Sequence, residues 1–418
     1  MPESLSNVDS SSQEYKKARR LHLKATRHKN EDHNWTSFRT VEKKFKARFP
    51  PPDLSNVLDL ATLNPAKTNE VQGGVWTGRS DTVEYREIVL AGHATKGYTV
   101  SQIPGLVILP SFLSSEQQQD LVKWSLSEQA RSPNETNLDT HYVLPSEGIW
   151  ANWLCCRNDP SKDILIYPKA LVTTSNPVLP GPRQLVENTP ANPHNFSALA
   201  SIPKPPQVPS PNVQAVFSST LIPKLRWANI GWYYHWGTKQ YDFAQGKAPI
   251  HDRVKNLCKG VVESIDWGQI FSDVQPDWGD GEPDWRTWRD TYEPDAGIVN
   301  FYQGRDTLMA HVDRSEVCAT SPLVSISLGN AAIFLIGGLT RDTEPIPIML
   351  RSGDVVIMAG PWCRRAYHGI PRILEGTLPS HLQSEEPKWQ PYKDYMQSTR
   401  ININVRQVFP KGFNPVMG

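Results

Sequence analysis

The segment Asn300–Glu316, NFYQGRDTLMAHVDRSE, holds two residues whose types and spacing suit a metal ion. Residues i and i+2 of an extended chain point to the same face, so His311 and Asp313 would present an imidazole and a carboxylate side by side. This pair would supply two ligands of a 2-His-1-carboxylate facial triad, the ligand set of non-haem Fe(II) oxygenases. The His-x-Asp pattern is also common in surface turns, so this interpretation needs a third ligand elsewhere in the chain.

The third ligand is expected to be a histidine well downstream, on a different strand. Of the 11 histidines, eight precede the segment just described, and His381 lies in a polar loop. His368, in RRAYHGIP, lies 55 positions after Asp313 and follows the apolar run Val355–Met358. A lone histidine at such a place is more often a packed or surface residue, but the upstream pair favours a role as the third ligand.

A second informative stretch is RININVR, from Arg400 to Arg406. As a strand it would place both arginines on one face, together with the amides Asn402 and Asn404, and three apolar residues on the other. Ordinary surface strands alternate in the same way, but two arginines separated by amides also offer bidentate recognition of carboxylates. An iron oxygenase that uses an α-keto diacid needs such a surface, with one arginine for the distal carboxylate.

The elements that would position these residues are short β-prone runs, most of them in the last third of the chain. Regularly spaced short strands separated by Gly and Pro indicate a sandwich, jelly roll or barrel. A double-sheet jelly roll has an interior open at one end, which is a suitable place for a metal. The expected strands are Gly105–Leu109, Leu323–Leu328, Ala332–Ile336, Pro347–Leu350, Val355–Met358 and Arg400–Val408.

Helices and a long loop are expected before these strands. Ser114 followed by Gln117 is a capping-box signature for a helix that runs to about Arg131. The stretch His251–Trp267 has apolar residues at helical spacing. Ten of the 36 prolines fall between Pro177 and Pro211, among Ser, Asn and Thr, so we expect a loop or insertion with no packed core there.

The charge of the chain is unevenly distributed. The formal net charge is +1, yet Tyr15–Arg48 holds 12 Lys or Arg against 3 Asp or Glu. We expect a basic helix there, closed by the three prolines at 50–52. Such an arm suits a nucleic-acid backbone or an acidic partner, and the alternative is a solvated helix with incidental charge.

Cysteine usage and hydropathy limit the compartment. The five cysteines are scattered and never in CxxC spacing, which argues against a disulfide framework or a Cys-based zinc site and favours a reducing compartment. No apolar run is long enough to span a bilayer, and we find no hydrophobic signal core at the N-terminus. We expect a soluble intracellular protein of the nucleus or cytoplasm, without a membrane partner, and leave the mitochondrion open.

Taken together, these stretches resemble the AlkB family of iron(II)- and 2-oxoglutarate-dependent dioxygenases, and within it the AlkB homologue 1 branch. The resemblance spans roughly residues 38–410 without the proline-rich insertion, and its set of motifs is specific. The segments that carry it are Asn300–Tyr302, His311–Asp313, Ser327–Gly338, SGDVV from Ser352, His368-Gly, Arg400–Arg406, and, for the branch, HVDRSE, LRWANIGWYYHW, NLDTHY and RQV.

The resemblance implies a mainly β fold with helical extensions (α+β), built on a double-stranded β-helix, or jelly-roll, core. It also implies a division of the chain. The expected parts are a disordered tail (1–14), a basic N-terminal extension (15–100), a dioxygenase domain (101–410) and a second tail (411–418). Within the domain we expect a substrate-lid and helical part (101–290), with a proline-rich insertion at 170–212, and the jelly-roll core (291–410).

The resemblance further implies Fe(II) as cofactor, with 2-oxoglutarate and O2 as co-substrates. The expected reaction is oxidative decarboxylation of 2-oxoglutarate to succinate, coupled to hydroxylation of an N-methyl group that leaves as formaldehyde. Arg400 would pair with the distal carboxylate of 2-oxoglutarate. The implied iron ligands are His311, Asp313 and His368, and the implied further co-substrate residues are Arg406, Asn300, Tyr302 and Asn402.

Substrate recognition is expected in an aromatic segment that resembles the nucleotide-recognition lid of the family. Its side chains could stack on an extruded or single-stranded base, and core packing is the alternative. In bacterial members an acidic residue two places after the metal-binding aspartate reads the methylated base, whereas here that residue is Ser315. The candidate substrate residues are Ser315, Trp227, Trp232, Tyr234 and Trp236.

Three functions are compatible with these residues. We expect oxidative demethylation of N-methylated bases in tRNA or DNA. The alternative is the same chemistry on a protein side chain, such as a methyl-lysine of a histone. An RNA-binding adaptor with an inactive jelly roll would require the loss of a ligand, and all three ligands are present.

Overall fold

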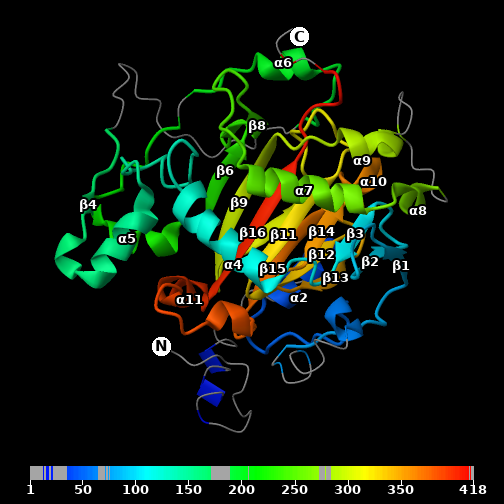
Figure 1. Cartoon of the computed structure of the whole chain (residues 1–418), viewed down its shortest axis with the longest axis horizontal. Coiled ribbons are helices and arrows are strands. Elements are labelled where there is room, and N and C mark those ends of the chain that lie inside the picture. Colours follow the sequence, from blue (N-terminus) through cyan, green and yellow to red (C-terminus); the bar gives the residue numbers. More distant parts are fainter. Residues whose placement is uncertain are drawn as a thin grey trace.

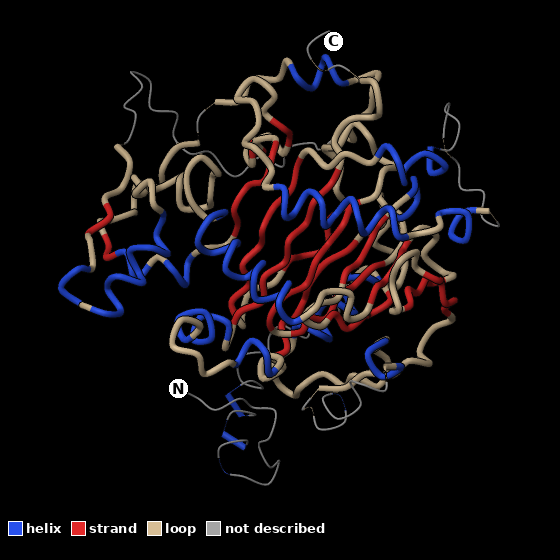
Figure 2. The backbone as a smooth tube through the Cα atoms, viewed as in Figure 1, coloured by secondary structure: helices blue, strands red, loops and turns tan. Residues whose placement is uncertain are grey.

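The computed structural model describes residues 35–64, 76–170, 189–205, 207–272 and 284–413, with isolated positions between and beyond them. Two antiparallel sheets occupy its centre, and helices and long loops surround them (Figures 1 and 2). In spatial order the larger sheet contains β1 (Tyr85–Val89), β2 (Lys96–Val100), β3 (Leu106–Leu109), β14 (Val355–Met358), β11 (Leu323–Gly329), β16 (Thr399–Arg406), β9 (Ala296–Gln303) and β6 (Trp227–Gly231). The smaller sheet contains β10 (Leu308–His311), β15 (His368–Leu374), β12 (Ala331–Ile336) and β13 (Ile346–Leu350).

The two sheets enclose an apolar interior. In β12, Ala332, Phe334 and Ile336 point into this interior, whereas the alternate residues Ile333 and Leu335 join a cluster on the outer face of the sheet. Both faces of the strand are buried, which explains why it reads as a continuous apolar run. Two facing antiparallel sheets of this kind form a double-stranded β-helix, so the predicted fold class is confirmed. Every predicted strand is present, with its ends shifted by at most two residues.

Two helices cover the outer face of the larger sheet (Figure 1). These are α4 (Ser115–Trp124) and α7 (Asp252–Ser264), and their apolar residues share one core cluster with Ile401 and Ile403 of β16. The capping box predicted at Ser114 is confirmed, since its Oγ accepts from the Gln117 backbone and its N–H donates to the Gln117 side chain. Further helices among the described residues are α5 (Gly148–Asn158), α6 (Phe196–Ala200), α8 (Trp267–Phe271), α9 (Trp288–Thr291), α10 (Gly360–Cys363) and α11 (Gln390–Met396).

A further helix, α2 (Ser37–Lys46), covers the outer face of the smaller sheet. Phe38 and Phe45 are buried in the same cluster as Ile333 of β12. Glu42 is also buried and accepts a hydrogen bond from the Ala310 backbone at 2.9 Å. The last part of the predicted basic arm is therefore an integral part of the fold, while most of residues 15–34 lie outside the described residues.

The larger sheet recruits strands from well before the expected core segment. The strands β1, β2 and β3 extend one edge beyond β14, and β6 adds the opposite edge beyond β9. Strand β1 lies in a stretch where the sequence has no clear period. The predicted limits of the domains stay predictions. The larger sheet is assembled from three separate parts of the chain: β1 to β3, β6, and the strands from β9 onward.

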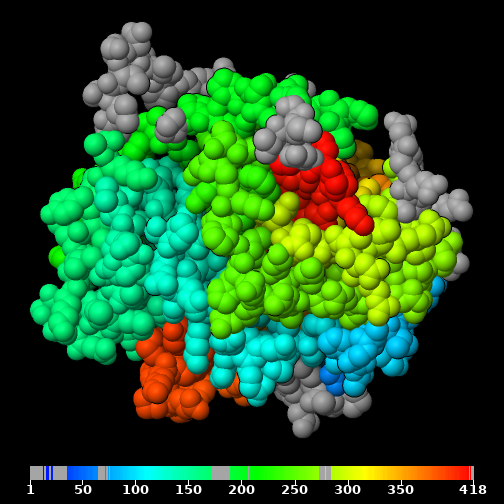
Figure 3. All heavy atoms as spheres, turned by 45° about the horizontal axis from the view of Figure 1, so that its top comes forward, coloured from blue at the N-terminus to red at the C-terminus, as the bar shows by residue number. Residues whose placement is uncertain are grey.

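The proline-rich stretch contributes to a packed cluster, contrary to the prediction from its composition. Ala191 and Phe196 are buried together with Tyr241 and Phe409, because the main chain there brings α6 over the C-terminal segment. Figure 3 shows the green segment before residue 250 next to the red segment at the C-terminal end of the chain. Residues 171–188 of the insertion lie outside the described residues. No helix among the described residues is long and apolar enough to cross a membrane.

Candidate metal centre and co-substrate site

The three predicted metal ligands meet at one end of the interior. His311 ends β10 and His368 begins β15, and the two are direct partners in the register of this antiparallel pair. Their ring centroids are 4.4 Å apart. Asp313 follows two residues after His311, and one ligand atom from each of the three lies within 4.8 Å of the others. Strand pairing thus brings together two histidines that are 57 positions apart in the sequence.

Backbone contacts set the tautomers of both histidines. His311 Nδ1 lies 3.0 Å from the carbonyl oxygen of Met309, and His368 Nδ1 lies 3.0 Å from that of Ala366. A carbonyl can only accept, so each Nδ1 carries the proton and each Nε2 keeps a lone pair for a metal. Burial, helped by the nearby His311, lowers the pKa of His368 to about 4, which keeps this imidazole neutral at pH 7.

The Asp313 carboxylate divides its two oxygens between two neighbours. Oδ2 accepts a hydrogen bond from Arg406 Nη1 at 3.0 Å, and Oδ1 lies 3.6 Å from His311 Nε2. Burial alone would raise the pKa of Asp313, but the charge of Arg406 holds it well below its usual value. Asp313 is therefore ionised and presents one oxygen beside two imidazole rings, a donor set that suits Fe(II).

The polar face of β16 points into the interior, as the alternation predicted. Arg400 lies opposite Tyr302 of β9, and Asn402 lies opposite Asn300. The Asn402 side chain donates to Ser325 Oγ at 2.8 Å and to a backbone carbonyl of β11. The four residues form one polar strip across two neighbouring strands, running away from the metal ligands.

Arg400 is a buried cation with incomplete hydrogen bonding. It is 1% exposed, its Nη2 donates to Ser327 Oγ at 3.0 Å, and its guanidinium lies 5.4 Å from the centre of the Tyr302 ring. Among the described residues, neither its Nε nor its Nη1 has a hydrogen-bond partner. Burial lowers its pKa to about 10, so it stays charged. A buried cation with two unsatisfied donors fits the distal carboxylate of a bound dicarboxylate such as 2-oxoglutarate.

A cavity of about 410 Å³ is lined by two of the three predicted metal ligands. His311, Asp313 and Arg406 line its floor, and Asn300 lies beside them, while Arg400 is not among its lining residues. Tyr302 and Asn402 are not among the lining residues either. The cavity therefore reaches His311 and Asp313 and leaves Arg400 outside its lining.

The aromatic candidates separate into two groups. Tyr234 and Trp236 line the cavity, and the Trp227 ring packs against Trp236 with centroids 5.1 Å apart. Trp232 instead packs against Phe243 and Phe409, at 5.2 and 5.9 Å between ring centroids. Trp232 is not among the residues that line the cavity, and its surroundings match the core-packing alternative.

Ser315 lines the cavity, but its hydroxyl is already hydrogen-bonded to other residues of the protein. Oγ donates to the Lys239 carbonyl at 2.8 Å and lies 3.3 Å from the Tyr234 hydroxyl. These contacts join the metal-binding segment to the small hairpin of β7 (Tyr234–His235) and β8 (Gln240–Tyr241). A second two-stranded sheet consists of β4 (Leu165–Ile166) and β5 (Val216–Phe217), none of which lines the cavity.

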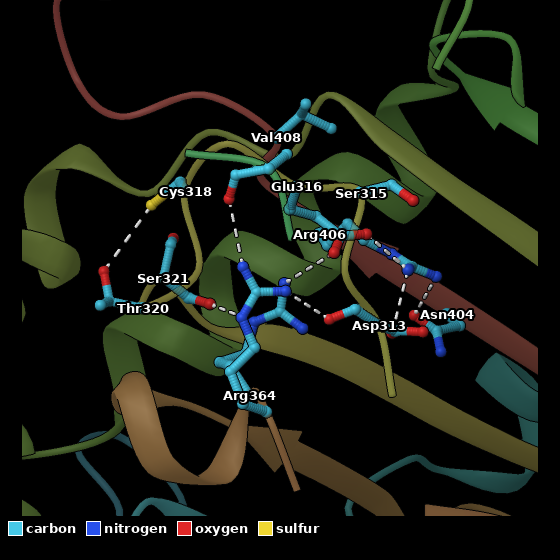
Figure 4. A network of polar contacts seen from close by, with 12 residues as sticks. Asp313, Ser315, Glu316, Cys318, Thr320, Ser321, Arg364, Asn404, Arg406 and Val408 are labelled. Atoms are coloured by element: carbon cyan, nitrogen blue, oxygen red, sulfur yellow. Dashed lines mark hydrogen bonds and ion pairs between the residues drawn. The ribbon is translucent and has the colours of Figure 1, made fainter. Parts of the chain in front are cut away.

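Sequence reasoning missed three charged residues around Asp313. These are Glu316, Arg364 and Arg365. Glu316 accepts a hydrogen bond from Arg406, and Arg364 lies beside Glu316 (Figure 4). Arg365 donates to the Asp313 carbonyl at 2.7 Å. The signal that could have found them is weak: Glu316 closes the HVDRSE motif, and the arginine pair precedes the predicted third ligand by a few residues. Their burial becomes visible only in the folded chain.

Comparison with known proteins identifies the family. Residues 183–406 match the model of the 2OG-Fe(II) oxygenase superfamily. The "tRNA demethylase abh1" of Schizosaccharomyces pombe is 30% identical over 89% of this chain and 96% of its own length. The "DNA N(6)-methyladenine demethylase ALKBH1A" of Arabidopsis thaliana is 29% identical over 91% of this chain and 98% of its own. A solved structure titled "The structure of OsALKBH1" has a TM-score of 0.39 at 18% identity, covering 73% of this chain and 97% of that one.

The chain belongs to the 2OG-Fe(II) oxygenase superfamily, in its AlkB homologue 1 group. This family uses Fe(II) with 2-oxoglutarate and O2, so the predicted cofactor and co-substrates are confirmed. The residues present fit them, because a His-Asp-His donor set and a buried unsatisfied arginine lie in one interior.

Proposed function

We propose that this protein is an oxidative demethylase of N-methylated bases in tRNA or DNA, dependent on Fe(II) and 2-oxoglutarate. The observation that carries the proposal is the pairing of the three ligands with Arg400, whose buried guanidinium keeps two donors unsatisfied. The sequence similarity to relatives named as tRNA and DNA demethylases extends over most of the chain and supports a nucleic-acid substrate. The expected place of action is any compartment that holds tRNA or DNA: the nucleus, the cytoplasm or the mitochondrion.

In this proposal each residue of the strip and the triad has one task. His311, Asp313 and His368 hold Fe(II), and Arg400 binds the distal carboxylate of 2-oxoglutarate. Asn300, Tyr302, Asn402 and Arg406 line the path between them and orient the co-substrate. When bound, iron and 2-oxoglutarate supply the oxygen chemistry: one atom of O2 enters succinate, and the other enters the methyl group, which leaves as formaldehyde.

The cavity offers an aromatic surface for the base. Trp236 is 38% exposed and lines the cavity beside Tyr234, so a base extruded from its stack could lie against these rings. Stacking on an aromatic side chain contributes roughly 1–3 kcal/mol per base and tolerates different sequences. Trp227 supports Trp236 from behind, and Ser315 holds the hairpin that carries both cavity aromatics. We leave Trp232 out of the substrate set.

A direct comparison of substrates tests the proposal against the protein-substrate alternative. The purified full chain is incubated with N-methylated tRNA and DNA oligonucleotides, and separately with methyl-lysine histone tails, and formaldehyde is measured. We expect formaldehyde only from nucleic acid. Formaldehyde from the histone tails alone would contradict the proposal and favour the alternative.

We further propose that the basic arm guides nucleic acid to the cavity. On α2, Lys43, Lys44 and Lys46 are exposed, and Lys46 Nζ lies 3.3 Å from Thr307 in the turn before β10. This turn leads into β10, the strand that ends at His311. Residues 15–34 add seven further Lys or Arg against two acidic residues.

Replacing the seven basic residues of 15–34 by serine is expected to weaken nucleic-acid binding and to reduce its salt dependence, because each lost phosphate contact lowers the slope of log affinity against log salt by about 0.7–0.9. This variant leaves α2 and its buried phenylalanines in place, unlike a deletion of residues 1–48. Fluorescence anisotropy at several salt concentrations measures both effects. An unchanged slope would show that the arm has another use, and the serine variant should keep normal turnover of 2-oxoglutarate.

A further inference from the structure

Glu316, three residues after Asp313, is a carboxylate buried to 1% exposure. Its Oε1 accepts hydrogen bonds from Arg406 Nη1 at 2.8 Å and from the Tyr241 hydroxyl at 3.1 Å. Arg364 Nη2 lies 3.7 Å from its Oε2. Burial alone would raise the pKa of Glu316, but Arg406 and Arg364 hold it below its usual value, so this side chain is ionised.

The nitrogen of Arg406 that bonds Glu316 also bonds the metal-binding carboxylate. Nη1 lies 2.8 Å from Glu316 Oε1 and 3.0 Å from Asp313 Oδ2, so it stands between the two carboxylates (Figure 4). Its other terminal nitrogen, Nη2, donates to Asn404 at 3.1 Å. Three acceptors therefore fix the position of the guanidinium. Because Arg406 occupies Oδ2, only Oδ1 of Asp313 faces the Nε2 atom of His311.

Glu316 also determines how much negative charge Asp313 keeps for a metal. The buried carboxylate–arginine group consists of Asp313, Glu316, Arg364 and Arg406, with two charges of each sign. Without the charge of Glu316, Arg406 would pair with Asp313 alone, and the group would become positive beside the two histidines. A positive potential in a buried site opposes a divalent cation, and a fully neutralised carboxylate is a weaker ligand.

We propose that Glu316 is a positioning residue of the iron site: through Arg406 it holds Asp313 as a single-oxygen ligand and keeps the Asp313 charge available to the metal. The proposal rests on the proposed ligand set. Residues that contact ligands rather than the metal typically change metal affinity about 10–100-fold when they are replaced. Glu316 should fall in this range, because it acts on the proposed ligand Asp313 through Arg406.

The test is a metal titration of the metal-free full chain, independent of turnover. Mn(II), which does not oxidise in air as Fe(II) does, is titrated by calorimetry into the wild type and into Glu316→Gln, which keeps the shape and one acceptor oxygen. We expect Mn(II) affinity to fall about 10–100-fold. Glu316→Asp keeps the charge and is expected to bind Mn(II) more tightly than Glu316→Gln.

Glu42→Gln is a matched control. Glu42 is 3% exposed and contacts Arg39 and the Ala310 backbone, so the same substitution removes a buried carboxylate outside the carboxylate–arginine group. We expect Glu42→Gln to lower the melting temperature without changing Mn(II) affinity. If Glu316 were only a structural anchor, Glu316→Gln would behave in the same way.

Two results would overturn the proposal. One is unchanged Mn(II) affinity in Glu316→Gln, and the other is tighter Mn(II) binding by Glu316→Gln than by Glu316→Asp. Asp313→Ala in the same titration tests the ligand set separately. Affinity lost in Asp313→Ala but kept in Glu316→Gln rejects only the role of Glu316, whereas affinity kept in both rejects the proposed iron site itself.

Discussion

Asp313→Ala is expected to abolish succinate formation. The substitution removes the only carboxylate of the proposed triad and leaves two imidazoles, which alone hold a divalent cation weakly. We expect the loss of metal affinity to exceed about 100-fold, the upper range for a residue that only contacts a ligand. Succinate measured by mass spectrometry after incubation with Fe(II), 2-oxoglutarate and methylated oligonucleotide gives the result.

The control for this variant is Asp342→Ala, which removes an exposed carboxylate from the loop after β12. It should keep full turnover. In Asp313→Ala the guanidinium of Arg406 still has Glu316 as a partner, so the protein is expected to fold, and circular dichroism verifies this. Succinate formation by folded Asp313→Ala at the wild-type rate would show that the metal lies elsewhere.

Arg400→Met is expected to raise the concentration of 2-oxoglutarate needed for half-maximal turnover, while Mn(II) binding stays normal. A hydrogen bond to a charged group contributes about 1.5–3 kcal/mol, so losing the distal-carboxylate contact corresponds to roughly 10–200-fold. The metal ligands are untouched because Arg400 does not line the cavity floor. Initial rates measured over a range of 2-oxoglutarate concentrations give this shift, and calorimetry gives the Mn(II) affinity.

The stability of the same variant provides a second, independent result. Arg400 is a buried cation with two unsatisfied donors, so a methionine of similar length should leave the melting temperature of the co-substrate-free protein unchanged or higher. Arg351→Met is the matched control: its guanidinium bonds the buried Asp59 at 2.7 Å, and breaking a buried pair costs about 3–5 kcal/mol. An unchanged 2-oxoglutarate requirement in Arg400→Met would place the co-substrate elsewhere.

Local patterns in the sequence were sufficient to predict which residues of a regular strand share a face. The alternation of Arg400 to Arg406 predicted their shared inward face, and the His-x-Asp spacing predicted one pair of ligands. Both inferences rest on the period of two that every strand imposes. His368 was found by elimination among the few late histidines, and the fold places it opposite His311 in the pairing of β10 with β15.

Such patterns could not predict the contacts between segments that are distant in the sequence. The composition of the proline-rich stretch does not show that Phe196 packs against Phe409. This contact depends on how the tertiary fold places the two segments next to each other. The same limit applies to Trp232 and Trp236, which are four residues apart but face a packed cluster and an open cavity, respectively. Period and composition describe a residue's own element, whereas burial depends on the element that covers it.

The most direct measurement is mass spectrometry of modified nucleosides in tRNA and DNA from cells with and without the gene. Our account predicts that an N-methylated base accumulates without the gene. It also predicts that the wild-type protein restores the normal level and Asp313→Ala does not. Unchanged levels of every N-methylated base, together with a rise in histone methyl-lysine, would contradict it.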